Sequence, residues 1–381
     1  MARSSQTAIP CTLMRGGTSK GPFFLASDLP ADPALRDRVL LAVMGSPDPR
    51  QIDGLGGADP LTSKVAIVSP SSRPGMDVDY LFAQVSVDRP LVDVTPNCGN
   101  MLAGVGAFAI ERGIVKPRDP VTPIAIYMVN SGNSAVAHVP TPGGVPGFDG
   151  DASIPGVPGR SAAIPIDFLD TAGSACGVLL PTAKALDEID GVEATLIDNG
   201  MPVVVLRAAD FGKSGYETPA ELDADKEFKA RLETVRIAAG ELMGLGDVRC
   251  KVVPKMTLIA PPGERGNVAT RTFIPIKCHP AIGVLGALTV ATACILPGSV
   301  AAGIATVPSG PCKRLSVEHP SGEFTVEIEV KEGAPGLEIV RSGLLRTARA
   351  LFSGHVFVPA SVWHGTTDVN IPATTVPSDR K

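Results

Sequence analysis

The chain has 381 residues, of which 44% are hydrophobic and 19% are charged, and its formal net charge is −5. This length and composition allow a sizeable core and favour two domains over one. Aromatic residues make up only 4%, whereas 41 glycines and 36 prolines indicate frequent turns and short strands. No basic cluster is interleaved with aromatic residues, which argues against nucleic acid as a partner. A small anionic ligand stays compatible with the acidic balance, because a local site can be positive.

Seven cysteines are scattered along the chain without a Cys-x-x-Cys pair or a zinc-ligand spacing. This pattern favours reduced thiols in the cytoplasm, and it predicts no metal site. The first residues lack the apolar segment of a signal peptide. The segment 281–297 is almost wholly apolar, but it is short for a membrane span, so we expect a buried helix and no membrane contact. The sequence leaves the oligomeric state open, a homodimer included.

The first half of the chain alternates apolar strands with two helical segments. Its expected elements are, in order, a strand over 8–14, a loop over 15–21, a helix over 33–44, a glycine-rich loop over 53–59, strands over 63–68 and 77–88, a helix over 101–110, strands over 124–129 and 134–139, an exposed loop over 140–160 and a strand over 164–169.

The second half is predicted to repeat this plan. Its expected elements are strands over 194–197 and 202–206, a helix over 218–245, strands over 255–260 and 269–276, the apolar helix within 281–297, and strands over 313–317, 322–330 and onward to 358. The run Thr218-Pro219-Ala220-Glu221 has the form of a capping box with proline at the first helical position.

Each half therefore holds one helix that is apolar on all sides and opened by a polar turn. Such a helix must be surrounded by other elements. We expect an α+β fold with two similar domains, each a barrel-like sheet wrapped around a central helix, and an active site in the cleft between them. The expected domains are residues 1–185, completed by 366–381, and residues 186–365.

The most informative feature is a single cysteine in the run Asn97-Cys98-Gly99-Asn100, which leads directly into the helix expected over 101–110. Unpaired N–H groups and the helix dipole favour negative charge at a helix N-terminus. A thiol placed there suits proton transfer or nucleophilic attack, and the same N–H groups can hold a carboxylate. A buried core cysteine is the alternative, but polar turn residues are a poor way to bury a thiol.

Lys64 opens an apolar strand just after a loop with three glycines. A lysine at a strand edge is often simply solvated, but an enclosed lysine can act as an acid or base. In the earlier loop over 15–21, four polar residues could anchor carboxylates: Arg15, Thr18, Ser19 and Lys20. Arg271 is a candidate of the same kind. The order of Gly-Gly-Thr-Ser-Lys excludes a phosphate loop, and no His-Glu-x-x-His motif is present.

Together these motifs resemble the PrpF-like isomerases, whose fold is that of diaminopimelate epimerase. The matching runs are Met14-Arg15-Gly16-Gly17-Thr18-Ser19-Lys20-Gly21, Gly45-Ser46-Pro47-Asp48, Gln51-Ile52-Asp53-Gly54 with Gly56-Gly57, Thr62-Ser63-Lys64-Val65, Asp79-Tyr80-Leu81-Phe82 and Asn97-Cys98-Gly99-Asn100. The resemblance implies a proton shift, without a cofactor or metal, on an unsaturated di- or tricarboxylate.

The same resemblance implies roles for single residues. The proton-transfer pair of the family corresponds to Lys64 and Cys98. The predicted substrate contacts are Arg15, Thr18, Ser19, Lys20, Asn97, Gly99, Asn100, Arg271, Gly283 and Gly286. The epimerases carry a second catalytic cysteine near the position of Ala281 or Ile282, which are apolar here, and Cys278 is not assigned that role. This departure argues against racemisation by two opposed thiols.

Within the family, the runs 9–14, 37–44 and 102–106 look most like the tautomerases and isomerases of 4-oxalomesaconate, which serve bacterial gallate, protocatechuate and lignin-derived aromatic catabolism. The alternative is a 2-methylaconitate cis–trans isomerase of propionate metabolism. A non-catalytic binding protein on this fold is a further reading, under which Lys64→Met and Cys98→Ala would leave function intact.

Overall fold

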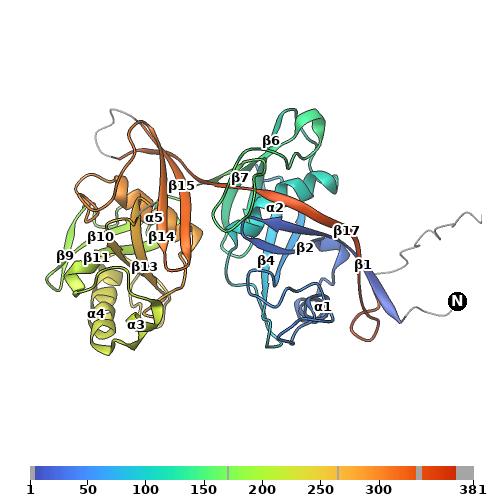
Figure 1. The fold of residues 1–381 in the computed structure, drawn as a ribbon, viewed down its shortest axis with the longest axis horizontal. Helices are drawn as coiled ribbons and strands as arrows, with labels where there is room; N and C mark the ends of the chain where they lie inside the picture. Colours follow the sequence, from blue (N-terminus) through green and yellow to red (C-terminus); the bar gives the residue numbers. More distant parts are fainter. Residues whose placement is uncertain (1–4, 170, 264–265, 332–336, 366–381) are drawn as a thin grey trace, which may run out of the picture.

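The computed structural model describes residues 5–169, 171–263, 266–331 and 337–365. It is a mixed α+β structure that consists mostly of sheet, and Figure 1 shows two lobes side by side. Hydrogen bonds between neighbouring strands link the described strands into one 17-stranded sheet. No helix among the described residues is long and apolar enough to cross a membrane.

The N-terminal lobe contains eight strands, two α-helices and two 3-10 turns before the chain crosses to the other lobe. These are β1 (Gln6–Gly16), β2 (Ser19–Leu25), η1 (Ala26–Asp28), α1 (Pro33–Met44), β3 (Lys64–Pro70), β4 (Val78–Val85), β5 (Val92–Asp93), α2 (Gly99–Glu111), β6 (Val121–Met128), β7 (Asn133–Pro140), η2 (Pro142–Gly144) and β8 (Ile164–Leu169).

The C-terminal lobe follows the same alternation and adds two outer helices. Its elements are β9 (Asp187–Ile189), β10 (Val192–Asp198), β11 (Pro202–Arg207), η3 (Ala208–Phe211), α3 (Pro219–Ala224), α4 (Lys226–Leu242), β12 (Lys255–Ala260), β13 (Val268–Phe273), α5 (Val284–Ile295), β14 (Cys312–His319) and β15 (Gly322–Val330). The last two strands are β16 (Ile339–Arg346) and β17 (Ala348–Pro359).

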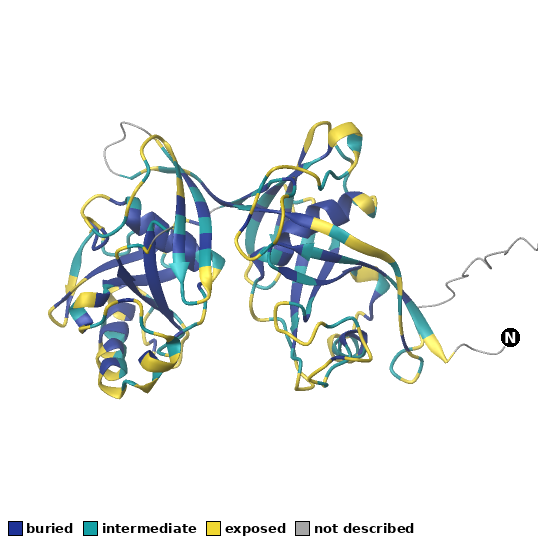
Figure 2. Cartoon of the chain, in the orientation of Figure 1, coloured by how far each residue is buried: buried dark blue, intermediate teal, exposed yellow. Residues whose placement is uncertain are grey.

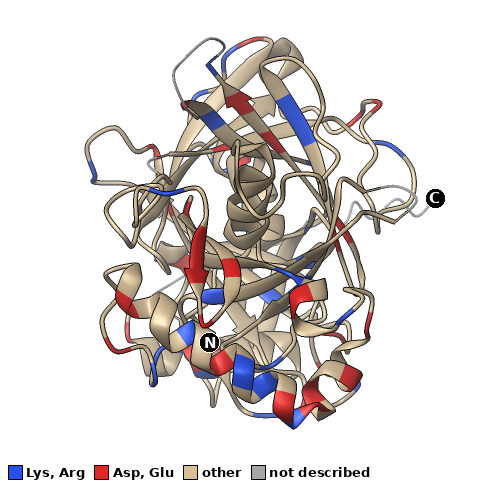
Figure 3. Ribbon diagram, turned by 90° about the vertical axis from the view of Figure 1, so that its left-hand side faces the viewer, with Lys and Arg blue, Asp and Glu red and all other residues tan. Residues whose placement is uncertain are grey.

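Each lobe encloses one apolar helix. In α2, every residue from Met101 to Ile110 is buried, and the helix contacts β1, β2, β3, β4 and β7. In α5, the residues Gly286 to Cys294 are buried, and the helix contacts β10, β11, β14 and β15. Figure 2 shows both helices in the colour of buried residues, inside their strands. In Figure 3 the charged residues of the C-terminal lobe lie on its outer helices and strands, and none lies on the central helix.

The crossing strand β16 joins the lobes, because it pairs with β15 on one side and with β8 on the other. The chain then continues into β17, which pairs with β1 in the N-terminal lobe. This strand falls inside the range 186–365 that the sequence assigns to the second domain. Residues 366–381, expected to complete the first domain, lie outside the described residues. The domain ranges therefore stay a prediction.

Two sequence predictions need correction. The loop expected over 15–21 is a hairpin in which only Gly17 and Thr18 lie between β1 and β2, because Gly17 adopts a positive φ of 51° and lets the chain reverse at once. The helix expected over 218–245 is broken between α3 and α4 at Asp225. The backbone of Asp225 is extended and its side chain accepts a bond from the Phe228 N–H, so it caps a new helix. The capping box at Thr218 is confirmed.

Candidate active site

The N-termini of the two central helices meet between the lobes. The N-cap residue of α2 is Cys98 and that of α5 is Gly283, and neither provides a side-chain cap. By contrast, Asp32, Thr218 and Asp225 cap the other three α-helices with their side chains. A Cβ added to Gly99 would lie 2.6 Å from Cγ2 of Val284, so the two helix ends touch through a glycine. The first N–H groups of both helices, which no N-cap side chain satisfies, therefore begin at adjacent positions, and such groups can bind an anion.

Cys98 lies at this helix end, as the sequence predicts. Cys98 is 9% exposed, and its backbone carbonyl accepts a hydrogen bond of 3.2 Å from the Tyr80 hydroxyl. Tyr80 is fully buried, and burial followed by the charge of nearby Cys98 raises its pKa well above the usual value. The phenol therefore stays protonated and fixes the backbone that carries the thiol.

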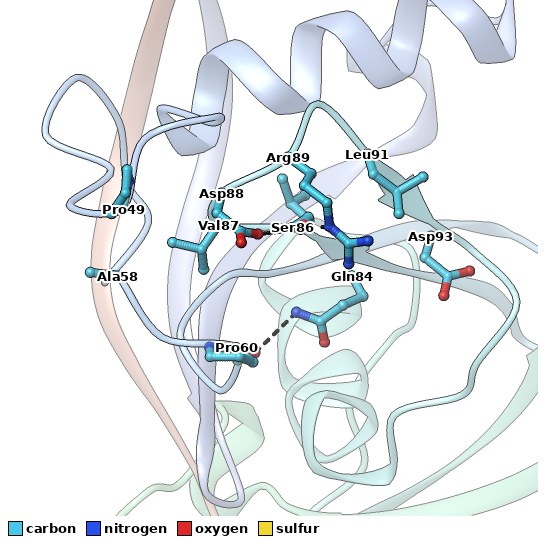
Figure 4. Close-up of a pocket in the computed structure, with 11 residues that line it drawn as sticks. Pro49, Ala58, Pro60, Gln84, Ser86, Val87, Asp88, Arg89, Leu91 and Asp93 are labelled. Carbon is cyan, nitrogen blue, oxygen red and sulfur yellow. Dashed lines mark hydrogen bonds and ion pairs between the residues drawn. The ribbon is translucent and has the colours of Figure 1, made fainter. Parts of the chain in front are cut away.

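Lys64 is the first residue of β3 and is half-buried. Its Nζ donates a 2.8 Å hydrogen bond to Oε1 of Gln84 and lies 5.1 Å from the centre of the Phe82 ring. Gln84 is itself held, because its Nε2 donates to the carbonyl oxygens of Pro60 and Ser63. Figure 4 shows the bond to Pro60 at the edge of a pocket of about 520 Å³. The lysine is therefore oriented by a neutral amide rather than neutralised by a carboxylate.

Strand β4 places the lysine and the cysteine on the same side of the sheet. Tyr80, Phe82 and Gln84 alternate along β4 and so share one face. Tyr80 holds the Cys98 backbone, while Phe82 and Gln84 contact Lys64. Both predicted proton-transfer residues thus meet the same row of side chains beside the first turn of α2.

The β1–β2 turn covers this end of α2. Nδ2 of Asn100 donates a 3.0 Å hydrogen bond to the Thr18 hydroxyl. A Cβ on Gly17 would lie 2.1 Å from Oδ1 of Asn100, so a larger residue has no room in the turn. The turn and the helix end, predicted separately from the sequence, are therefore one structural unit.

Unpaired polar atoms mark the same place. Among the described residues, three buried side-chain oxygens have no hydrogen-bond partner: Oγ of Ser19, Oδ1 of Asn97 and one oxygen of Asp79. Buried polar atoms in proteins are nearly always paired, so such atoms call for an explanation. Two of the three, Ser19 and Asn97, belong to residues that the sequence predicts to contact substrate.

Arg15 and Lys20 lie on the opposite face of the hairpin. They are neighbours in the β1–β2 register, and Arg15 is also paired with Arg349 of β17. With Thr18 and Ser19 they line a pocket of about 270 Å³. The Arg15 guanidinium donates to the carbonyl oxygens of Gly17 and Thr347 and to the hydroxyls of Thr347 and Ser161, so it fixes the turn against the link between β16 and β17.

Arg271 lies in the C-terminal lobe, in a pocket of about 390 Å³ that also includes Tyr216 and His319. Its guanidinium donates to the carbonyl oxygens of Glu217 and Thr270. Burial, with the charges of His279 and Arg271, lowers the pKa of His319 to about 4. Pro155 of the N-terminal lobe also lines this pocket, and its lining includes no residue of the α2 end.

The start of α5 carries no ionisable side chain. A Cβ added to Gly283 would have no atom within 4 Å, and Gly286 is buried in the first turn of α5. Cys278, the nearest cysteine before this helix, is buried at 2% exposure in the core around α3 and α4. Burial and the charge of Asp223 raise its pKa to about 11, and its N–H donates to Asp223. It does not lie at the helix end.

Three residues of the site were given no role from the sequence: Tyr80, Gln84 and Arg346. Tyr80 belongs to a run that matches the family, which could have drawn attention to it. Arg346, at the end of the crossing strand, donates from Nε to Oδ1 of Asn100 at 3.1 Å. No local sequence pattern could predict this contact, because Arg346 and Asn100 are 246 positions apart. Within the described part of the chain, no group of three or more His, Cys, Asp or Glu residues is placed to hold a metal ion.

Comparison with known proteins supports the resemblance that the sequence motifs suggest. The family model described as PrpF protein matches residues 6–359. The chain belongs to the PrpF family. The chain is 60% identical to the (4E)-oxalomesaconate Delta-isomerase of Novosphingobium sp. strain KA1, over 92% of this chain and 97% of that protein. It is 58% identical to the 4-oxalomesaconate tautomerase of Pseudomonas putida, over 94% and 99%.

A solved structure also matches this PrpF-family chain along nearly its whole length. The crystal structure of methylitaconate-delta-isomerase superimposes with a TM-score of 0.80 at 35% identity, and the match covers 94% of this chain and 97% of that one. The arrangement of both lobes is therefore that of a known isomerase.

Proposed function

We propose that this PrpF-family protein is an isomerase that moves a proton within 4-oxalomesaconate, using Lys64 and Cys98 and no cofactor. Two relatives at 58–60% identity bear names for reactions on this compound. The observation that carries the proposal is that Lys64 and Cys98 meet one face of β4, at a helix end whose neighbours Ser19 and Asn97 have unpaired buried oxygens.

The substrate contains a methylene group between a ketone and a carbon–carbon double bond. Removal of a methylene proton gives a conjugated enolate, and reprotonation elsewhere gives either the enol or the allylic isomer. Each step needs one group to take a proton and one to return it. A positioned acid–base pair of this kind contributes about 10²–10⁴-fold to the rate. One of Lys64 and Cys98 removes the proton and the other returns it.

The carboxylates and the developing enolate need donors that are fixed before the reaction. The uncapped N–H groups at the starts of α2 and α5 supply them, together with the side chains of Thr18, Ser19, Asn97 and Asn100. Donors aimed at developing charge are often the largest contribution to catalysis. The substrate then lies between the two lobes, each a sheet wrapped around its central helix.

The remaining residues that the sequence predicts to contact substrate lie in different parts of the structure. Gly99, Gly283 and Gly286 belong to the two helix ends and remain in the proposed site. Arg15 and Lys20 line one pocket together with Thr18 and Ser19, and Arg271 lines another, so their contact with substrate stays a prediction from the sequence.

The test is proton NMR of 4-oxalomesaconate with the purified protein in D₂O. We expect rapid deuterium incorporation and a new isomer, and the position of the deuterium distinguishes the enol from the allylic product. Turnover of 2-methylaconitate but not of 4-oxalomesaconate would contradict the proposed substrate. No exchange above the buffer rate on either acid would contradict the proposed reaction.

A further inference from the structure

Arg346 is a buried cation at the end of the crossing strand. Arg346 is only 6% exposed, although arginine is rarely buried without an acidic partner. No carboxylate of the described residues forms an ion pair with it. Arg341, on the same strand, instead pairs with Asp167, Glu327 and Glu329. Among the described residues, therefore, no acidic group balances the charge of Arg346.

Parts of both lobes fix the guanidinium. Nε donates to Oδ1 of Asn100 at the α2 end, and Nη1 donates to the carbonyl oxygen of Leu345 at 2.8 Å. The guanidinium carbon lies 3.9 Å from the centre of the Phe324 ring, which belongs to β15 of the C-terminal lobe. Within the described residues, Nη2 donates no hydrogen bond. One nitrogen of a rigid fork thus stays free next to the α2 end.

Cys98 and Thr18 lie next to this cation. Burial lowers the pKa of Arg346 to about 10, and the charge of nearby Cys98 opposes that shift. Asn100 links the cation to the β1–β2 turn, because its Oδ1 accepts from Arg346 while its Nδ2 donates to Thr18. A negatively charged ligand at this point would meet the full charge of a guanidinium together with the partial charges of helix N–H groups.

We propose that Arg346 binds a carboxylate of the substrate beside Cys98, through Nη2 and the charge of its guanidinium. This inference rests on the proposed function only for the identity of the substrate, since any polycarboxylate of similar size would use the same contact. The arginine holds the anion in place while Lys64 and Cys98 transfer the proton. Asn100 is then a positioning residue, which orients Arg346 and the Thr18 turn together.

The test measures binding of propane-1,2,3-tricarboxylate, a saturated probe that cannot undergo the proton shift, by calorimetry. Wild type, Arg346→Lys and Arg346→Met are compared with Arg341→Met, a matched change on the same strand. Loss of a charge-assisted bond predicts a Kd about 10- to 100-fold higher for Arg346→Met. Arg346→Lys keeps the charge and is expected to fall between wild type and Arg346→Met. Arg341→Met is expected to stay within about threefold of wild type.

The dependence of affinity on salt separates a binding role of Arg346 from a structural one. If Arg346 pairs with the probe, the affinity of wild type falls more steeply with added NaCl than that of Arg346→Met. Three results would overturn the inference: wild type that does not bind the probe, Arg346→Met that binds within threefold of wild type, or Arg346→Lys as weak as Arg346→Met. Because the probe does not react, this result is independent of whether wild type turns over 4-oxalomesaconate.

Discussion

The starts of α2 and α5 are alike in backbone and unlike in chemistry. Both helices are apolar, buried and uncapped by side chains, and they touch through Gly99 and Val284. Only the start of α2 carries a thiol, and Lys64 and Arg346 lie beside it. The start of α5 offers N–H groups and apolar side chains. Two equivalent helix ends can therefore divide the work: under our proposal, one reacts and binds while the other only binds.

The largest effect is expected from removing the reactive groups of the α2 end. Lys64→Met and Cys98→Ser should each lower kcat by about 10²–10⁴-fold, because each deletes one half of the acid–base pair. Cys278→Ser, a matched change at a buried cysteine away from both helix ends, should stay within about threefold. The rates of all three variants are measured by following the reaction over time with NMR, and circular dichroism checks that each variant is folded. A loss for Cys278→Ser as large as that for Cys98→Ser would mean that loss of any buried thiol, and not of a reactive group, lowers kcat.

The contact between the helix ends gives the next effect. Gly99→Ala places a methyl group 2.6 Å from Cγ2 of Val284 and should push the ends apart. Small misplacements at a reactive site are costly, and we expect kcat/KM to fall by about 10- to 100-fold. Val284→Ala in the same chain should recover most of the loss because it removes the colliding methyl. Activity of the double variant equal to that of Gly99→Ala would argue against this contact as the cause.

Ser19 and Lys20 are adjacent residues of the hairpin, and their substitutions are expected to have different effects on KM. Ser19→Ala removes a buried hydroxyl that lacks a protein partner, and we expect KM to rise about tenfold through the loss of one hydrogen bond to a charged group. Lys20→Met should change KM by less than about twofold, because Lys20 shares the register position of Arg15 on the other face. Steady-state kinetics on both variants decides. An effect at Lys20 as large as that at Ser19 would support the sequence prediction that Lys20 also contacts substrate.

The smallest effect concerns pH and the pocket around His319. The pKa of His319 is about 4 in the folded protein, below its ordinary value of 6.5. The unfolded chain therefore binds a proton first, so this stability is present above pH 6.5 and is lost as pH falls toward 4. His319→Gln should reduce the loss of Tm between pH 7 and pH 5 by about 2–4 °C. Calorimetric scans at both values test this, and an unchanged pH dependence would contradict it.

The sequence predicts elements best where local signals suffice. Helix α1 has the predicted bounds because Asp32 caps its start and Gly45 adopts a left-handed conformation at its end. The placement of Cys98 at a helix start is confirmed for a similar reason, since the polar turn and the apolar run are adjacent in the chain. The short β1–β2 turn was missed because two residues carry too little pattern to separate a hairpin from a loop.

The rest of the site depends on contacts between distant parts of the chain. Arg346 lies in a strand that must cross between lobes before it reaches Asn100, and Phe324 comes from the opposite lobe. The shared face of Arg15 and Lys20 follows from the register of the hairpin, and the sequence could not give that register because the two-residue turn was not predicted. The break at Asp225 was hidden because helical residues flank it on both sides.

The most direct test of the central claim separates proton removal from isomerisation. Wild type, Lys64→Met and Cys98→Ser are each mixed with 4-oxalomesaconate in D₂O and followed by proton NMR. We predict that both variants lose isomerisation, while the variant that retains the base still exchanges the methylene proton with solvent. That result would identify which group removes the proton. Isomerisation at the wild-type rate in either variant would contradict the assignment of Lys64 and Cys98 as the reacting pair.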